Sequence, residues 1–280
     1  MTGSKIAVVV PAGPHDDAAD TLRSVLCYTD PELLLVIDDT RGRGIGFDDP
    51  RVMVFTPPAS PPGAHGGLWV KLAAAFRYAA QRTDFDVLLR LDTDALILGP
   101  GVAEAAAERF GRDPSIGALG AYRVGPDGQR RDWTPARKIL LSEVGLRGLR
   151  HWRARRRIRQ LVAGAPGYVP GEHALGAAVL YRGDMVREWD RRGMLDYAEL
   201  GASRLGEDHL FGLLTVAAGY RIADFSGPGD PLALRWQGLP AAPDDLLAAG
   251  KLITHSVRYW VGMSEAEIRQ FFATHRAAAR

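Results

Sequence analysis

Short runs of apolar and β-branched residues, most of them closed by a charged or turn-forming residue, constrain the fold of this chain more than any other feature. Runs of this length and composition are typical of strands buried on both faces of a parallel sheet. The predicted strands lie at 5–12, 33–39, 51–55, 86–98, 116–122, 174–181 and 220–225, and helical spacing marks 18–28, 68–81, 101–110, 206–218, 244–249 and a last helix from about 264. The order of the first eight elements predicts an α/β fold, an open and mostly parallel twisted sheet flanked by helices.

The length and the local composition suggest how the chain is divided. A chain of 280 residues suits one large α/β domain, or one domain with a small appendage. We expect a main domain at 1–235, made of a first half at 1–122 and a second half at 123–235, and an extension at 236–280 packed on the same domain. Residues 123–169 are rich in Arg, Gly and Pro, which indicates an insertion over the sheet.

Composition excludes several classes of protein. Cys27 is the only cysteine, so a disulfide framework or a cysteine-based zinc site within one chain is excluded. The net charge of +2 is too small to indicate a nucleic-acid partner. No apolar run approaches the ~18 residues that span a bilayer, and no signal peptide precedes the first strand. We therefore expect a cytoplasmic protein.

Two aspartates, Asp92 and Asp94, interrupt the apolar run DVLLRLDTDALIL. Residues two apart on a strand point to the same face, where two buried carboxylates repel each other. Mn²⁺ or Mg²⁺, which accept oxygen ligands, would stabilise such a pair. Arg90 is predicted on the same face, where it could bind an anion. The alternative is a turn in which the two aspartates cap the following segment.

The stretch LLRLDTDALIL resembles the DxD segment of GT-A glycosyltransferases, and four more segments resemble those of glycosyltransferase family 2 in the same order. KIAVVVPA is similar to the first strand, VIDDT to the acidic end of the second, GEHALGAAVLYRGDM to the acceptor-side strand and LGEDHLFGLLTVAAGYRIADF to the segment with the ED motif. Together these segments cover most of residues 5–225. The resemblance implies a Rossmann-like GT-A fold with a nucleotide-binding half and an acceptor half. It also implies transfer of a sugar from a nucleotide-diphosphate sugar, UDP-sugar by default, to an unidentified acceptor.

The resemblance also implies roles for residues at the donor. Asp94 and Asp92 would hold the divalent cation, which would neutralise the diphosphate, and Asp92 would also contact the ribose. Pro11 ends the strand that lies beside the nucleotide. Asp38 or Asp39 would accept hydrogen bonds from the base, although a local turn cap is the alternative for this pair.

On the acceptor side, the resemblance implies that Asp208 is the general base of an inverting transfer, with Glu207 as its substitute if the register differs. Acidic residues in a first helical turn also complement the helix dipole without any catalytic role. A retaining transferase of the same fold would not use Asp208 as a base. A non-catalytic protein that keeps the nucleotide site is a further alternative. A sugar-1-phosphate nucleotidyltransferase would need a glycine-rich, arginine-bearing loop where this chain has PAGPHDDAAD.

Two histidines and a lysine are weaker candidates. A late histidine completes the metal site in related folds, which would make His255 a ligand, and imidazole is acceptable to Mn²⁺. The alternative for His255 is simple packing. For His173 we expect a loop role, with the acceptor as the alternative. Lys71, preceded by Gly66 and Gly67 at a predicted helix start, would give a weak phosphate contact.

The basic stretch at 147–159, RGLRHWRARRRIR, has the most unusual composition of the chain. The simplest interpretation is a solvated helix face. Two more specific alternatives are peripheral contact with an anionic membrane and contact with a phosphorylated acceptor. Nucleic acid is disfavoured because no matching binding module is present.

Overall fold

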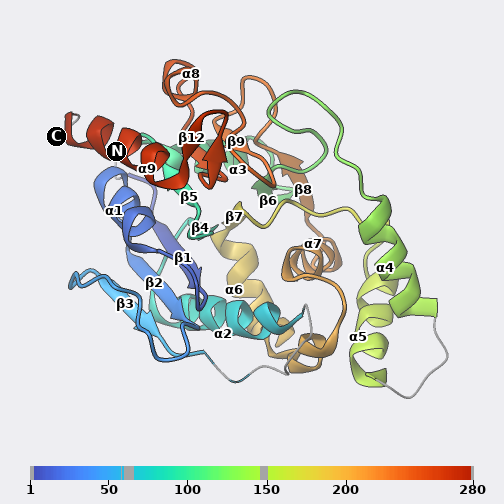
Figure 1. Cartoon of the computed structure of the whole chain (residues 1–280). Coiled ribbons are helices and arrows are strands. Elements are labelled where there is room, and N and C mark those ends of the chain that lie inside the picture. Colours follow the sequence, from blue (N-terminus) through green and yellow to red (C-terminus); the bar gives the residue numbers. More distant parts are fainter. Residues whose placement is uncertain (1–2, 58, 60–65, 146–150, 279–280) are drawn as a thin grey trace.

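The computed structural model describes residues 3–57, 59, 66–145 and 151–278 (Figure 1). A seven-stranded sheet with the strand order β3-β2-β1-β4-β7-β6-β8 forms its centre. These strands are β1 (Ile6–Ala12), β2 (Leu33–Asp38), β3 (Val52–Phe55), β4 (Val87–Leu91), β6 (Ile116–Gly120), β7 (Ala178–Arg182) and β8 (Arg221–Asp224). Every pairing is parallel except those of β7, which runs antiparallel to β4 and β6. The predicted α/β fold with a mostly parallel sheet is therefore confirmed.

Helices cover both faces of this sheet because its strands are apolar on both sides. On β1, Ile6, Val8 and Val10 pack toward α1 (Ala19–Tyr28) and α3 (Val102–Arg112). The alternate residues Ala7 and Val9 belong to the cluster formed with the helices of the other face. Those helices are α2 (Gly67–Arg82), α6 (Gly183–Arg191) and α7 (Glu207–Ala217). The 3₁₀ turns Met194–Asp196 and Ala198–Ala202 connect α6 to α7.

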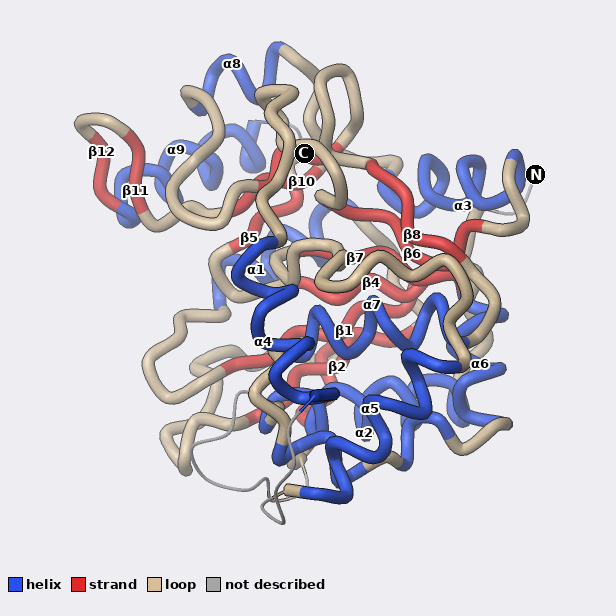
Figure 2. Tube along the Cα trace, turned by 90° about the vertical axis from the view of Figure 1, so that its right-hand side faces the viewer, coloured by secondary structure: helices blue, strands red, loops and turns tan. Residues whose placement is uncertain are grey.

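The chain between β6 and β7 stays at the edge of the sheet where the parallel strands end. Ala178 begins β7 opposite Leu91, the last residue of β4, so β7 starts at this edge and runs back. The excursion carries α4 (Thr134–Gly145) and α5 (Trp152–Ala163), which lie side by side at the outside of the molecule (Figures 1 and 2). Ile158 and Leu161 of α5 join the cluster that contains α7. The insertion is thus partly helical, as expected.

A smaller layer built from the C-terminal part packs beside the main sheet. Its three strands follow the order β5-β10-β9, and a short hairpin and two helices complete it. Its elements are β5 (Ala95–Ile97), β9 (Leu232–Leu234), α8 (Pro243–Ala248), β10 (Ile253–His255), β11 (Tyr259–Trp260), β12 (Met263–Ser264) and α9 (Glu265–Ala278). Among the described helices, none combines the length and the apolar character needed to cross a bilayer.

The expectation of one continuous strand at 86–98 is wrong. The amide of Ala95 donates to the carbonyl oxygen of Asp92 (3.1 Å), which closes a turn between β4 and β5. The two strands then belong to different sheets, because β5 pairs with the distant β10. Asp92 and Asp94 therefore do not share one face of a strand: they lie in the turn, which was the alternative for their backbone conformation. The sequence analysis also missed α6.

Candidate active site

The turn at Asp92 lies at the switch point of the main sheet. From β1 the chain builds β2 and β3 to one side and then returns to place β4 on the other side of β1. Ligands of open α/β sheets bind at such a point, outside the carboxyl ends of the strands. Here carboxylate oxygens of Asp92 and Asp94 and an imidazole nitrogen of His255 lie within 4.8 Å of one another. The structure thus brings together all three residues predicted as metal ligands.

The side chains around Asp94 hold it ionised and orient His255. Oδ1 of Asp94 lies 3.1 Å from Nε2 of His255, and Oδ2 accepts hydrogen bonds from Ser256 Oγ (2.9 Å) and Arg258 Nε (2.7 Å). Burial alone would raise the pKa of Asp94, but the hydrogen bonds from His255 and Arg258 hold this pKa well below its usual range. Nδ1 of His255 lies 2.6 Å from the carbonyl oxygen of Arg235. A carbonyl only accepts, so Nδ1 carries a proton. Nε2 faces Asp94 and donates to it when it is also protonated; a bound cation would take the place of that second proton, as in many histidine metal ligands.

Arg90 links the predicted metal site to the predicted catalytic helix. Its Nη2 lies 3.0 Å from Asp92 Oδ1 and 2.9 Å from Glu207 Oε1, and its side chain is buried. Burial raises the pKa of Asp92, although Arg90 and His255 act to lower it. The charged form of Asp92 therefore lacks full compensation within the chain. Two carboxylates and one imidazole form a donor set that suits Mn²⁺, and less well Mg²⁺, so the residues present fit a divalent cation.

The residues predicted to contact the nucleotide lie at the ends of β1 and β2. Pro11 is buried in β1 opposite Ile37. Asp38 accepts hydrogen bonds from the amide (2.9 Å) and hydroxyl (2.6 Å) of Thr40, which is the local turn cap given as its alternative role. Asp39 instead forms an ion pair with Lys71 of α2. Of the aspartate pair, Asp39 is thus the one joined to another predicted nucleotide contact.

The glycine before α2 has a packing role. The amide of Gly66 donates to the carbonyl oxygen of Ser203 (3.1 Å). A Cβ atom at Gly66 would collide with the carbonyl oxygen of Leu200. Close approach to the 3₁₀ turn accounts for glycine here, and the amide of Gly66 is not available to a phosphate.

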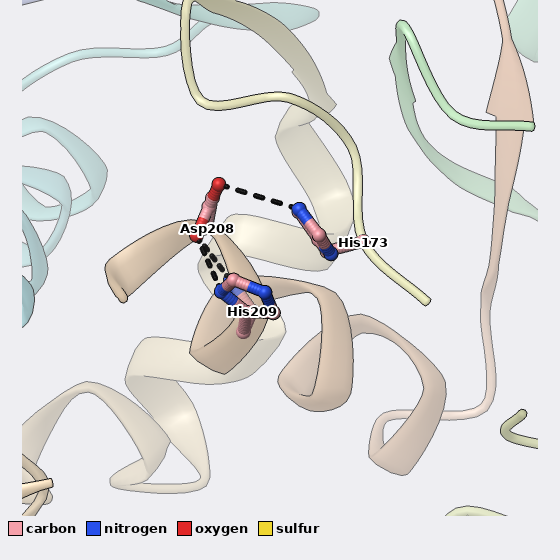
Figure 3. Close-up of side chains that lie close together, drawn as sticks. All are labelled: His173, Asp208 and His209. Carbon is pink, nitrogen blue, oxygen red and sulfur yellow. Dashed lines mark hydrogen bonds and ion pairs between the residues drawn. The ribbon is translucent and has the colours of Figure 1, made fainter. Parts of the chain in front are cut away.

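Asp208 lies in the first turn of α7, near His173 and His209 (Figure 3). It also lines a cavity. Its Oδ1 accepts the backbone amide of His209 (2.8 Å), and its Oδ2 lies 3.6 Å from Nε2 of His173. Burial would raise the pKa of Asp208, but the hydrogen bond from His209 and the proximity of His173 hold it well below the usual range. For Glu207, burial and the charge of Asp208 raise the pKa to about 7. Asp208 is therefore the ionised member of the pair.

The cavity has a volume of about 670 Å³, and we call it the acceptor cavity because the sequence resemblance predicts that Asp208, which lines it, faces the acceptor. The chain after β6 and the segment after β9 form its walls, and Asp208, His173 and His209 line it together. Trp236, whose side chain is among the most exposed large apolar groups, lies in its wall. His173 occupies a loop, as expected, and this loop brings it to Asp208.

Several residues of the site escaped the sequence analysis. Ser256 and Arg258 hold Asp94, His209 lies beside Asp208, and Arg131 donates to the carbonyl oxygens of Ala121 (2.6 Å) and His173 (2.7 Å). The polar residues that follow His255 in LITHSVRYW were the available signal for two of them. No local pattern marks Arg131, whose role depends on the path of the insertion.

The basic stretch divides into inward and outward arginines. Arg157 pairs with Glu199 (2.8 Å) and Arg155 approaches Glu143 (3.7 Å), so these two fasten α5 to the molecule. Arg153 and Arg156 are exposed. Residues 147–150 of the stretch lie outside the described part of the chain. Contact with an anionic membrane stays a prediction, as does the cytoplasmic location.

No family model matches the chain, and no curated protein matches it either. Solved structures are similar to it at low sequence identity. A galactosyltransferase, LgtC, in complex with donor and acceptor sugar analogues is 11% identical, with 97% of this chain and 95% of that chain covered and a TM-score of 0.47. The mannosyltransferase PcManGT from Pyrobaculum calidifontis, in complex with GDP-Man and Mn²⁺, is 15% identical, with 80% and 55% covered and a TM-score of 0.43.

A third similar structure is a nucleotidyltransferase. The 2-C-methyl-D-erythritol 4-phosphate cytidylyltransferase from Thermus thermophilus is 15% identical, with 87% of this chain and 96% of that chain covered and a TM-score of 0.41. The chain spans about half the length of the mannosyltransferase. The structures similar to this chain thus include glycosyltransferases, which the sequence resemblance predicted, but with TM-scores below 0.5 only the site itself bears on the reaction.

Proposed function

We propose that the protein is a metal-dependent glycosyltransferase, which moves a sugar from a nucleotide-diphosphate sugar to an acceptor hydroxyl. One observation carries the proposal: Asp92, Asp94 and His255 converge at the switch point of the sheet, within 4.8 Å of one another. A divalent cation held there would neutralise the diphosphate and the charge that grows on the leaving group. The imidazole favours Mn²⁺ over Mg²⁺.

The chain's own residues divide the remaining tasks. Asp39 and Lys71 lie at the ends of β2 and α2, where the nucleoside would bind, with UDP as the default. In an inverting reaction the acceptor oxygen forms a bond to the anomeric carbon while the bond to the diphosphate breaks. Asp208, ionised and facing the acceptor cavity, takes the proton of the acceptor hydroxyl. Arg90 joins Asp92 to Glu207, which fixes the donor site relative to the acceptor side.

The test is the thermal stability of the protein with UDP, GDP or dTDP, each in Mn²⁺ and in EDTA. A ligand at about 100 times its Kd adds roughly 2.7 kcal/mol to the unfolding free energy. We expect one nucleotide to stabilise the wild type in Mn²⁺ only, and Asp94→Ala to abolish this shift. The stabilising nucleotide then defines the donors to screen for sugar transfer and for the anomeric configuration of the product.

The matched control is Asp84→Ala. Asp84 lies just before β4, at the opposite end of the strand, and its side chain is 74% exposed. This variant should keep the full nucleotide shift. No shift with any nucleotide in folded wild type, or an equal shift in EDTA, would contradict the proposal.

A further inference from the structure

A second group of possible metal ligands lies in the wall of the acceptor cavity. His173, Asp208 and His209 place imidazole nitrogens and a carboxylate oxygen within 4.8 Å of one another (Figure 3). The rings of His173 and His209 also lie close, with their centroids 3.7 Å apart. None of these residues belongs to the donor set at Asp92, Asp94 and His255.

The hydrogen bonds of His173 leave its Nε2 turned toward Asp208. Its Nδ1 lies 2.8 Å from the carbonyl oxygen of Gly171, which only accepts, so Nδ1 carries a proton. In the neutral ring, Nε2 then has a lone pair that faces Asp208 Oδ2 at 3.6 Å. Arg131 Nη2, 3.2 Å away, donates to this lone pair, and a bound ion would take its place. Fixing one ring nitrogen on a backbone carbonyl is the usual way to orient a histidine ligand.

His209 supplies an independent sign that a ligand is missing. Both of its ring nitrogens are buried, and Nε2 has no hydrogen-bond partner among the described residues. Nδ1 lies 2.8 Å from Oδ1 of Asp208, which also accepts the backbone amide of His209. A buried polar group without a partner is destabilising, and an ion bound to the imidazole would remove this cost.

We propose that His173, Asp208 and His209 form a site for a transition-metal ion of the Zn²⁺ class. Two imidazoles and one carboxylate suit Zn²⁺ or Co²⁺, whereas Mg²⁺ prefers oxygen ligands. Three protein ligands leave a further coordination position, which opens into the acceptor cavity. The chain would then carry two metal sites of different selectivity.

The site has a consequence that rests on the proposed function. Oδ1 of Asp208 is held by the amide of His209, so Oδ2 is the oxygen open to either a metal ion or a proton. An ion on Oδ2 therefore excludes Asp208 from accepting the acceptor proton. Zn²⁺ should inhibit transfer, and added Mn²⁺ should not reverse this inhibition.

The test is equilibrium dialysis of Zn²⁺ against the full chain in excess Mg²⁺, with the bound metal measured by elemental analysis. We expect the Asp94→Ala protein to keep one tightly bound Zn²⁺. His173→Gln and His209→Gln should each weaken Zn²⁺ binding at least tenfold. Co²⁺ added to the wild type should give a visible absorption band, and this band should be absent from the same two variants. The control is His275→Gln, because His275 is an exposed histidine of α9.

Folding of each variant is checked by circular dichroism, and the two histidine variants serve as independent tests because they lie on different elements. Unchanged Zn²⁺ binding in both, or loss of Zn²⁺ in Asp94→Ala alone, would overturn the second site. This readout needs no turnover. A failed transferase assay would therefore leave it standing, and a failed Zn²⁺ assay would leave the donor site standing.

Discussion

Glu207 and Asp208 are neighbours in sequence, but they have different surroundings. Glu207 accepts from the buried Arg90 (2.9 Å), and its pKa is raised to about 7 by burial and by the charge of Asp208. Asp208 lies beside two histidines and faces the acceptor cavity. The same acidic pair in the first turn of a helix thus places one carboxylate on Arg90 and the other, the proposed base, at the cavity.

At this scale we predict that Asp208→Asn lowers the transfer rate by about 10²–10⁴-fold, because the amide cannot take the acceptor proton. Nucleotide affinity should stay within a few-fold of wild type. Glu207→Gln keeps an oxygen for Arg90 and should lose much less rate. Single-turnover transfer and nucleotide titration, both in Zn²⁺-free buffer with Mn²⁺, separate the two effects. Near-normal turnover in Asp208→Asn would favour a retaining mechanism or another base.

At the scale of elements, α9 is fastened to α1 by buried charges. Asp20 of α1 pairs with Arg276, and its other oxygen lies 3.7 Å from Arg269. Arg269 also donates to the carbonyl oxygen of Thr93 (2.9 Å), inside the turn that carries Asp92 and Asp94. The C-terminal helix therefore supports the turn from outside the main sheet.

We predict that Asp20→Asn lowers the unfolding free energy by about 3–5 kcal/mol, since it leaves the buried Arg276 without its carboxylate and Arg269 with Glu265 alone. Glu104→Gln is the matched control: Glu104 also lies in a first helical turn, that of α3, but it is exposed. Loss of its interaction with the helix dipole should cost about 0.3–1 kcal/mol. Urea unfolding of both variants gives the comparison. Equal losses would mean that the arginines are satisfied without Asp20.

For the whole molecule, the connections between layers indicate one cooperative unit. β5, which follows the turn at Asp92, pairs with β10 of the C-terminal part, and the amide of Val257 donates to the carbonyl oxygen of Asp94 (2.9 Å). One cluster of buried apolar side chains joins Leu96 and Leu98, in and just after β5, to Ile268 and Phe272 of α9. Unfolding of 236–280 alone would therefore separate His255 from Asp92 and Asp94, the proposed metal ligands.

We predict a single calorimetric transition, with equal calorimetric and van't Hoff enthalpies, for the metal-free protein. Mn²⁺ with the stabilising nucleotide should move the whole transition upward without splitting it. Two transitions, with nucleotide binding lost in the first, would instead show that 236–280 unfolds as a separate unit. The domain boundary near residue 235 stays a prediction until this is measured.

Local patterns in the sequence determined much of this protein. The apolar runs predicted each strand of the main sheet to within a few residues, because a strand buried on both faces must be apolar throughout. The run at 86–98 is the exception. Asp92 and Asp94 stood out as carboxylates within an apolar run, and Asp208 marked the first turn of a helix. These features depend on neighbours in sequence, so a single chain reveals them. The helix at Gly183–Arg191 was missed because it follows β7 without a separating turn.

Tertiary structure decided the rest, through contacts between residues far apart in the chain. The run at 86–98 became two strands because β10 pairs with its second part. His255 faces Asp94 only because β10 lies there, and His173 meets His209 only because the insertion returns to the sheet beside α7. Metal ligands and cavity walls are assembled from such distant segments, and no local spacing records which of them will meet.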